Sequence, residues 1–189
     1  MFVVRSMKRI PALVLCLASL SMSSALAASP SANIVPAGTP QWLVIPKLGV
    51  HASVEHITML NPQDVHAPYK WEDVAWSSFG PRPGQHGNAT IFGHVDSTCC
   101  PAVFYRLHTL VAGDRFDVLY PGNRVLPFRV MWATTYANKE LPVKWLYGRN
   151  RNRGLTLITC TGDFHRNGSG YDHKYLVYSR LILPNGTLG

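Results

Sequence analysis

Seven short runs of β-type composition, separated by turn-forming residues, most strongly limit what this chain can fold into. The runs lie at residues 43–50, 53–57, 89–95, 115–120, 125–136, 155–160 and 175–183. Pro121-Gly122-Asn123 stands between two of them and predicts a hairpin loop. Only residues 71–79, 102–110 and 143–147 suggest short helices. Many short strands with few helices predict an all-β domain, built as a barrel or a sandwich.

The first residues have the pattern of an export segment. Three basic residues precede the apolar stretch 10–26, and Ala25-Leu26-Ala27 fits a small-x-small cleavage site. Residues 1–27 therefore predict a secretory signal peptide or, alternatively, an N-terminal membrane anchor. Residues 28–41 are rich in Pro, Ser and Gly and predict a flexible linker before a domain at 42–189. Either alternative places that domain outside the cytoplasm, at the cell membrane, on the cell wall surface or secreted.

A strand that ends in a thiol is the first candidate for chemistry. In 155–160 the apolar run finishes on Cys160, just before Thr161 and Gly162. A second β-rich run, 91–96, carries His94 at its end. Cysteine and histidine, distant in sequence but close in space, are the groups that a thiol nucleophile needs.

These two motifs resemble those of the sortases, the cell-wall cysteine transpeptidases of mostly Gram-positive bacteria. Thr156-Leu157-Ile158-Thr159-Cys160 follows Gly93-His94-Val95-Asp96, and the cysteine stands 66 positions after the histidine (160 − 94 = 66). Further similarity covers about residues 42–183 and looks closest to the single-domain sortases of classes D to F; it includes 42–50, 80–84, 87–89, 101–107 and 112–114. The resemblance implies a closed, mainly antiparallel β-barrel of about eight strands with a few short helices, and makes 42–189 a catalytic domain.

The resemblance also implies an activity and its partners. Sortases cut surface proteins at a C-terminal motif of the Leu-Pro-x-Thr-Gly or Leu-Ala-x-Thr-Gly kind, between Thr and Gly, through a thioester acyl-enzyme. The protein is then transferred to an amine of a cell-wall precursor or a pilin. Two alternatives stay open: a thiol peptidase that uses water as acceptor, and a catalytically impaired surface module with the same fold.

Roles in the site follow from the same resemblance. Cys160 would be the nucleophile and His94 the general acid and base. The family stabilises the oxyanion with an arginine on the next strand, where this chain has Lys174. Lysine is a cation without the planar fork of arginine, so Arg166 is kept as the alternative.

Two further residues are expected beside the catalytic pair. Thr159 and Asp96 are assigned to substrate binding. Asp96 lies two residues after His94, so on a continuing strand it would point the same way and orient the imidazole. It could equally cap the loop that follows.

The other cysteines leave the redox state open. Cys99 and Cys100 could form a vicinal disulfide and leave Cys160 free, or one of them could pair with Cys160 and block it. Together with His94 and Asp96 they lie within seven residues, but adjacent cysteines without a distant ligand pair fit zinc poorly. We expect no metal and no other cofactor.

A basic cluster near the end of the chain could suggest nucleic acid. It comprises Lys144, Arg149, Arg151 and Arg153. No nucleic-acid motif stands beside it, and export argues against that partner. The sequence predicts a solvated loop and no nucleic-acid binding.

Overall fold

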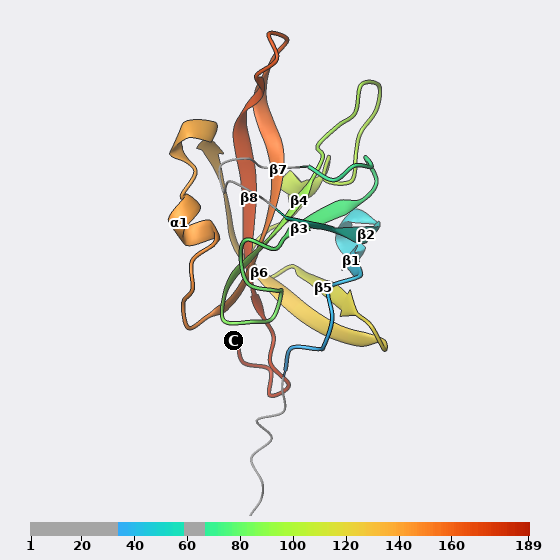
Figure 1. Ribbon diagram of the computed structural model, residues 1–189, viewed down its shortest axis with the longest axis vertical. Coiled ribbons are helices and arrows are strands. Elements are labelled where there is room, and N and C mark those ends of the chain that lie inside the picture. Colours follow the sequence, from blue (N-terminus) through green and yellow to red (C-terminus); the bar gives the residue numbers. More distant parts are fainter. Residues whose placement is uncertain (1–33, 59–66) are drawn as a thin grey trace, which may run out of the picture. The chain divides into compact units, whose positions relative to one another are not determined.

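The computed structural model describes residues 34–58 and 67–189. Eight strands form a closed barrel in the order β1-β2-β3-β4-β7-β8-β6-β5 (Figure 1). The strands are β1 (Trp42–Ile45), β2 (Val50–Ile57), β3 (Val74–Ser77), β4 (Gly87–Gly93), β5 (Arg115–Tyr120), β6 (Arg124–Ala137), β7 (Arg153–His165) and β8 (Gly170–Leu181). The helical elements are short: η1 (Pro46–Leu48), η2 (Leu107–Thr109), η3 (Asn138–Glu140) and α1 (Val143–Leu146). The all-β barrel expected from the sequence is confirmed.

Most neighbouring strands run antiparallel, and two pairs are parallel. β2 pairs with β3 and β4 pairs with β7 in parallel, whereas the other six pairings that close the barrel are antiparallel. Because β4 and β7 run the same way, both strands begin at one end of the barrel and both finish at the other. In the closed barrel this parallel pair lies between β3 and β8, and it sets the geometry of the site.

The barrel interior is filled by apolar side chains from alternating strand positions. Phe116 and Phe128, on paired strands, stack with ring centroids 5.7 Å apart. Leu155 and Leu157 of β7 are fully buried in the same cluster, and Ile158 points to a second, smaller cluster with Leu146 of α1. β4 is buried along its whole length. Its two polar side chains, Asn88 and Thr90, are buried as well, and both donate to the carbonyl oxygen of Leu146.

One predicted helix is wrong. Residues 71–79 were expected to be helical, but 74–77 form β3, with all four residues buried. This strand lies between β2 and β4 and hydrogen-bonds to both. Pairing on two edges outweighs a local pattern that is too short to separate a strand from a helix. Of the helix expected at 102–110, only the short η2 is formed, whereas α1 confirms the helix expected at 143–147.

A predicted single strand at 43–50 is divided into two. Pro46 starts η1, and Gly49 follows it with a φ of +68°. Proline has no N–H to donate to a ladder, and a positive φ suits glycine, so the chain turns between β1 and β2. In contrast, the hairpin loop expected at Pro121-Gly122-Asn123 is present between β5 and β6.

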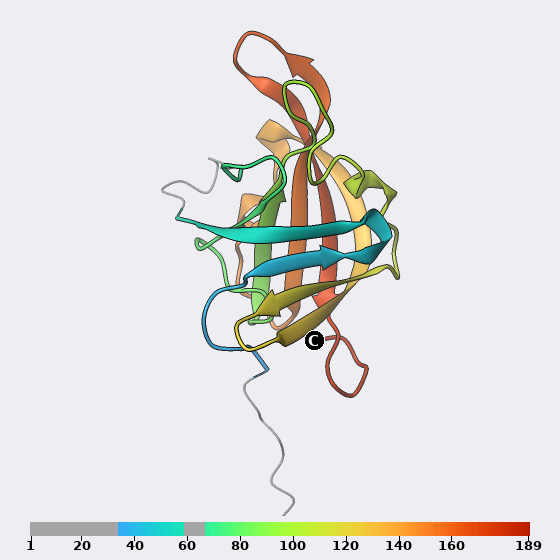
Figure 2. The same cartoon turned by 90° about the vertical axis from the view of Figure 1, so that its right-hand side faces the viewer.

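β7 and β8 are longer than the sequence predicted. β7 continues past Cys160 to His165, and β8 begins at Gly170 rather than at residue 175. Most of the extra residues are polar, and all of them, including Phe164, are exposed or half-buried, so no apolar pattern marks these segments. They form a hairpin that rises beyond the barrel (Figures 1 and 2).

The N-terminal segment predicted at 1–27 lies outside the described residues, as does part of the linker. No helix within 34–58 or 67–189 has the length and apolar character needed to cross a bilayer.

Candidate active site

A groove of about 760 Å³ opens where β4 and β7 finish. One wall is the loop that follows β4, and the other is the β7–β8 hairpin; both rise from the same end of the barrel (Figure 2). The lining residues are Trp71, His94, Val95, Asp96, Ser97, Thr98, Cys160, Phe164, His165, Arg166, Gly168, Gly170 and Tyr171. Cys160 and His94, the two residues on which the sequence argument rested, therefore face the same groove.

Cys160 is held at the groove by two strand pairings. In the parallel pair, Phe92 lies opposite Ile158, so the register carries His94 to the level of Cys160. Two residues after the cysteine, the β7–β8 ladder is interrupted by a bulge at Gly162, whose φ is +86°. A Cβ there would lie 2.2 Å from the Asp172 carboxylate. The glycine after the Thr-Cys-Thr motif thus allows the strand to bend just beyond the thiol.

His94 is fixed by contacts on both sides of its ring. Its Nε2 lies 2.9 Å from the carbonyl oxygen of Pro68, and the ring of Trp71 packs on it with centroids 4.3 Å apart. A carbonyl only accepts hydrogen bonds, so the contact assigns a proton to Nε2 and leaves Nδ1 to exchange one. Gly93, the preceding residue, has no room for a Cβ because the Phe104 ring would be 2.5 Å away.

Lys174 reaches the sulfur from the neighbouring strand. It pairs directly with Cys160 in the β7–β8 register, so both side chains share a face. Its Nζ donates a hydrogen bond to Cys160 Sγ at 3.5 Å. This hydrogen bond places the amino group of Lys174 beside the sulfur.

Arg166, the alternative cation, lies on the exposed hairpin tip. It lines the groove, but it forms no hydrogen bond or ion pair with another described residue. Of the two candidates, Lys174 is the one that contacts Cys160.

Asp96 does not contact His94. β4 ends at Gly93, so the strand geometry that would align the two side chains stops before His94. Asp96 instead accepts a 2.5 Å hydrogen bond from the hydroxyl of Tyr171 on β8. This hydrogen bond to Asp96, with partial burial and the charges of Asp96 and Cys160, raises the pKa of Tyr171 to about 12. The phenol therefore stays protonated at neutral pH and joins the two walls of the groove.

Thr159 faces away from the groove. Its side chain is buried, and its hydroxyl donates to the carbonyl oxygen of Gly93 at 2.8 Å. Thr159 is not among the residues that line the groove, whereas a substrate contact was expected of it. The bond ties the ends of β4 and β7 together, immediately beside His94 and Cys160.

All three described cysteines are free thiols. Cys99 and Cys100 are exposed on the loop after β4, with their Sγ atoms 2.6 Å apart, and neither is bonded to Cys160. A hydrogen bond from Cys100 lowers the pKa of Cys99. Within residues 34–58 and 67–189, no three His, Cys, Asp or Glu side chains group in a way that could hold a metal ion.

Sequence reasoning missed three residues of the site. Trp71 and the Pro68 carbonyl hold the histidine, and Tyr171 bonds to Asp96. Trp71 fell within the wrongly predicted helix. A backbone carbonyl and a tyrosine 75 residues from its partner leave no local signal in a single sequence.

Comparison with known proteins gives a consistent family. The family model described as "Sortase domain" matches residues 43–182. No curated protein matches the chain.

Three solved structures illustrate the similarity in fold. Sortase A from Corynebacterium diphtheriae has a TM-score of 0.60 at 18% identity, over 78% of this chain and 63% of that one. Sortase C-1 from Actinomyces oris has a TM-score of 0.58 at 23% identity, over 75% and 73% of the two chains. A Clostridium perfringens sortase D5 transpeptidase has a TM-score of 0.56 at 19% identity, over 77% and 79%. This chain thus spans less than two thirds of the C. diphtheriae protein. Placement in classes D to F stays a prediction, because these structures are sortases A, C and D.

Proposed function

The chain belongs to the sortase family, since the family model covers 43–182, and from this premise we propose that it is an extracytoplasmic cysteine transpeptidase. The observation that carries the proposal is the meeting of three groups at one groove. Cys160 and His94 line it, and Lys174 donates a hydrogen bond to the sulfur. These are a nucleophile, a proton carrier and a fixed positive charge, which acyl transfer by a thiol requires.

In the first half-reaction, the Cys160 thiolate attacks the carbonyl carbon of the Thr–Gly bond in a sorting motif. A C–S bond forms, and the carbonyl oxygen takes up negative charge beside the Lys174 ammonium. The C–N bond then breaks, and His94 gives a proton to the departing glycine amine. The product is a thioester between Cys160 and the threonine carbonyl.

In the second half-reaction, an amine of a cell-wall precursor or a pilin attacks the thioester carbon. His94 accepts a proton from this amine, the C–S bond breaks, and the thiolate returns. The amide that forms joins the surface protein to its acceptor. The motif is of the Leu-Pro-x-Thr-Gly or Leu-Ala-x-Thr-Gly kind, and the N-terminal segment at 1–27 would export the enzyme or anchor it.

Residues that border the groove would contribute to binding. Asp96 and Tyr171 cross its walls, and Phe164 and Trp71 offer exposed aromatic surface to an extended peptide. Thr159 would act through the strands rather than through the substrate, because its hydroxyl is already donated to Gly93.

Intact-mass measurement tests the proposal. The chain is incubated under mild reductant with each motif peptide, with and without an added amine. We expect a thioester adduct on the enzyme and, with the amine, a ligated peptide. The adduct must disappear in Cys160→Ala, whose fold is checked by thermal unfolding.

The same assay separates the alternatives. Hydrolysed peptide that is unaffected by the amine would indicate a thiol peptidase. A folded wild-type chain that forms no adduct with either motif would contradict the proposal, and a gain of adduct in Lys174→Arg would locate the defect in the lysine.

A further inference from the structure

A second pocket of about 760 Å³ lies at the other end of the same two strands. Its lining includes Arg82 and His86, just before β4, and Arg149 and Arg153, just before and at the start of β7. From Arg153 to Cys160 is seven residues along β7 (160 − 153 = 7), or roughly 23 Å at ~3.3 Å per residue. The pocket is therefore separate from the catalytic groove.

Two of the arginines are held by backbone carbonyls. Arg82 Nη1 donates to the carbonyl oxygens of Pro36 and Gly38, and Arg153 Nη1 donates to that of Gly84 at 2.6 Å. A guanidinium has five N–H donors in a rigid fork. These bonds fix the two forks and leave donors on each of them unused. Prearranged guanidinium donors suit the oxygens of a phosphate group.

Within the part of the chain that the structure describes, no Asp or Glu side chain neutralises this pocket. Asp and Glu are absent from its lining, and none of Arg82, Arg149 and Arg153 forms an ion pair there. Arg149 makes no hydrogen bond at all with the described residues. Three like charges that face one cavity without a counter-charge repel each other, so an anion that enters the cavity would relieve that repulsion.

The wall also includes apolar groups, which lie beside the polar side chains of Ser78, Gln85 and His86. Phe79 is 50% exposed and packs edge-on against Tyr147, with ring centroids 5.3 Å apart. Val35, Pro36 and Ala37 complete this side. A cavity whose lining combines arginines with apolar groups can accept an anion that is attached to an apolar body.

We propose that this arginine pocket binds a phosphodiester group, such as the headgroup of an anionic phospholipid. The chain connectivity agrees with a lipid source. Val35 to Ala37 follow the segment expected to be an export signal or anchor, and seven residues, 28–34, intervene. Seven extended residues reach about 25 Å, so an anchored chain would hold the pocket within that distance of the membrane surface. A soluble phosphodiester would share the same chemistry.

Calorimetric titration of the full chain tests the site. The probes are dihexanoyl phosphatidylglycerol below its micelle concentration, the phosphatidylcholine analogue, and glycerophosphoglycerol, which is the anionic headgroup without acyl chains. We expect saturable binding of phosphatidylglycerol, weakened about tenfold or more in Arg149→Gln, since charge-assisted hydrogen bonds are lost. Arg149 is exposed and forms no hydrogen bond or ion pair with the described residues, so we expect Arg149→Gln to leave the fold intact.

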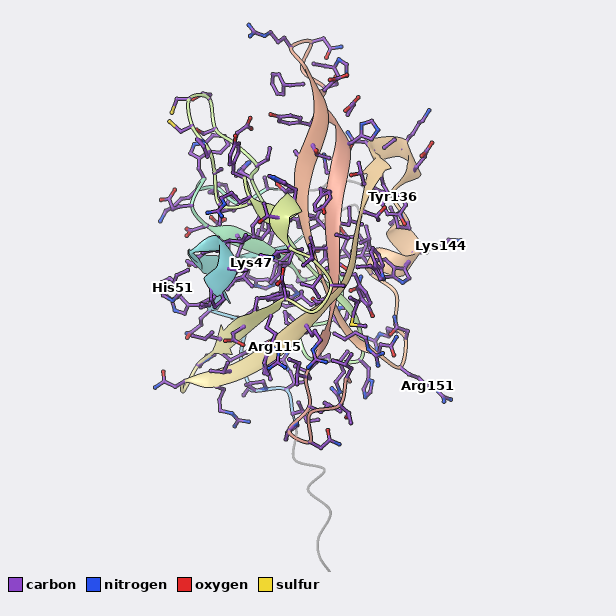
Figure 3. The ribbon with its side chains drawn as sticks, turned by 180° about the vertical axis from the view of Figure 1, so that it is seen from behind. Lys47, His51, Arg115, Tyr136, Lys144 and Arg151 are labelled. Atoms are coloured by element: carbon purple, nitrogen blue, oxygen red, sulfur yellow. The ribbon has the colours of Figure 1, made fainter. Side chains whose placement is uncertain are left out.

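Arg151→Gln is the matched control. Arg151 carries the same charge two residues away on the same loop, lies outside the pocket lining, and extends from the barrel surface (Figure 3). It should weaken binding less than about threefold, as expected for a screened surface charge. Both variants retain the apolar segment 10–26, so lipid taken up by that segment cancels in the comparison.

Each outcome is decisive. Equal affinity for glycerophosphoglycerol would support the site and identify its source as a soluble phosphodiester. Binding of phosphatidylcholine as tight as that of phosphatidylglycerol would overturn the proposal. Equal losses in Arg149→Gln and Arg151→Gln, or an absence of saturable binding to all three probes, would overturn it as well.

Discussion

The two ends of the β4–β7 pair carry opposite kinds of chemistry. Where the strands finish, a thiol and an imidazole meet at an open groove, with one lysine contact to the sulfur. Where they begin, arginines surround a pocket with no Asp or Glu side chain among its described lining residues. A parallel pair keeps both starts together and both finishes together. The difference teaches that one pair of strands can position a reactive site and, about 23 Å away, a separate charged site.

The two ends also differ in how their residues are supplied. At the reactive end, His94 and Cys160 each stand directly after a buried strand segment. Nearby glycines, Gly93 and Gly162, allow close packing there. At the basic end Arg82 and Arg149 come from loops and Arg153 begins β7, and carbonyl oxygens hold Arg82 and Arg153. Substitutions should therefore separate the ends, and the following four are ordered from the largest expected effect to the smallest.

Cys160→Ala should have the largest effect and should leave the basic end untouched. Loss of the nucleophile removes the acyl-enzyme, and we expect transpeptidation to fall on the order of 10⁴-fold or more. Affinity for dihexanoyl phosphatidylglycerol should stay the same. Product formation measures the first quantity and calorimetric titration the second. If Cys160→Ala lowered both the transpeptidation rate and the affinity for the lipid, the two ends would be coupled and the comparison would fail.

Lys174→Ala should lower the acyl-transfer rate by about 10²–10³-fold, the usual consequence of losing one oxyanion donor. Lys174→Arg should restore most of the rate, because arginine keeps the charge and adds a planar fork. Single-turnover formation of the thioester measures both. If Lys174→Ala retained full activity and Arg166→Ala lost it, the hairpin tip would hold the functional cation.

Tyr171→Phe should lower the rate about tenfold by releasing the hydrogen bond between the two groove walls. The raised pKa of Tyr171, about 12, has a consequence for stability. The hydrogen bond of the protonated phenol contributes fully to the free energy of unfolding below the pKa of an unfolded tyrosine, about 10. This contribution is lost as pH rises toward about 12. The Tm difference between wild type and Tyr171→Phe should shrink over that window. A difference that is constant up to pH 12 would contradict this account.

Asp172→Asn should have the smallest effect, a fall in Tm of about 2 °C or less at pH 7, because the pair of Asp172 and His173 is only half-buried and water screens its charges. The hydrogen bond from His173 holds the pKa of Asp172 below its usual value. Its contribution is present above the unfolded pKa of about 3.9 and is lost as pH falls further. Thermal unfolding at pH 7 and near pH 3 checks that the difference vanishes in acid. A larger difference in acid would give the carboxylate another role.

Much of the barrel could be predicted because its strands carry apolar patterns. The segment 115–120 was bounded as the structure has it, and 155–160 lies within β7. Patterns failed where pairing rather than local composition decides the structure. β3 is formed by hydrogen bonds on both edges, and the polar half of the β7–β8 hairpin has no buried face. A single sequence reveals neither the pairing partners of β3 nor the continuation of a strand that has no buried face.

The site shows the same limit. Cys160 and His94 could be proposed from the sequence because each closes a β-type run, and Lys174 because the family resemblance expects a cation at that position of the next strand. Of the two roles considered for Asp96, orientation of the imidazole assumed that strand alternation continues past Gly93, where β4 stops. Trp71, Tyr171 and the arginine pocket depend on contacts between distant loops, for which residue spacing gives no rule.

The parallel pairing of β4 and β7 also bears on when the chain becomes reactive as it folds. A hairpin forms from neighbouring segments, but β4 and β7 can pair only after the 59 residues between them have looped back (153 − 93 − 1 = 59). Such long-range closures are slow relative to local structure. We therefore expect Cys160 and His94 to reach their common groove late in folding, because that groove exists only when β4 and β7 are paired. Appearance of thiol reactivity would then serve as a kinetic marker of barrel closure.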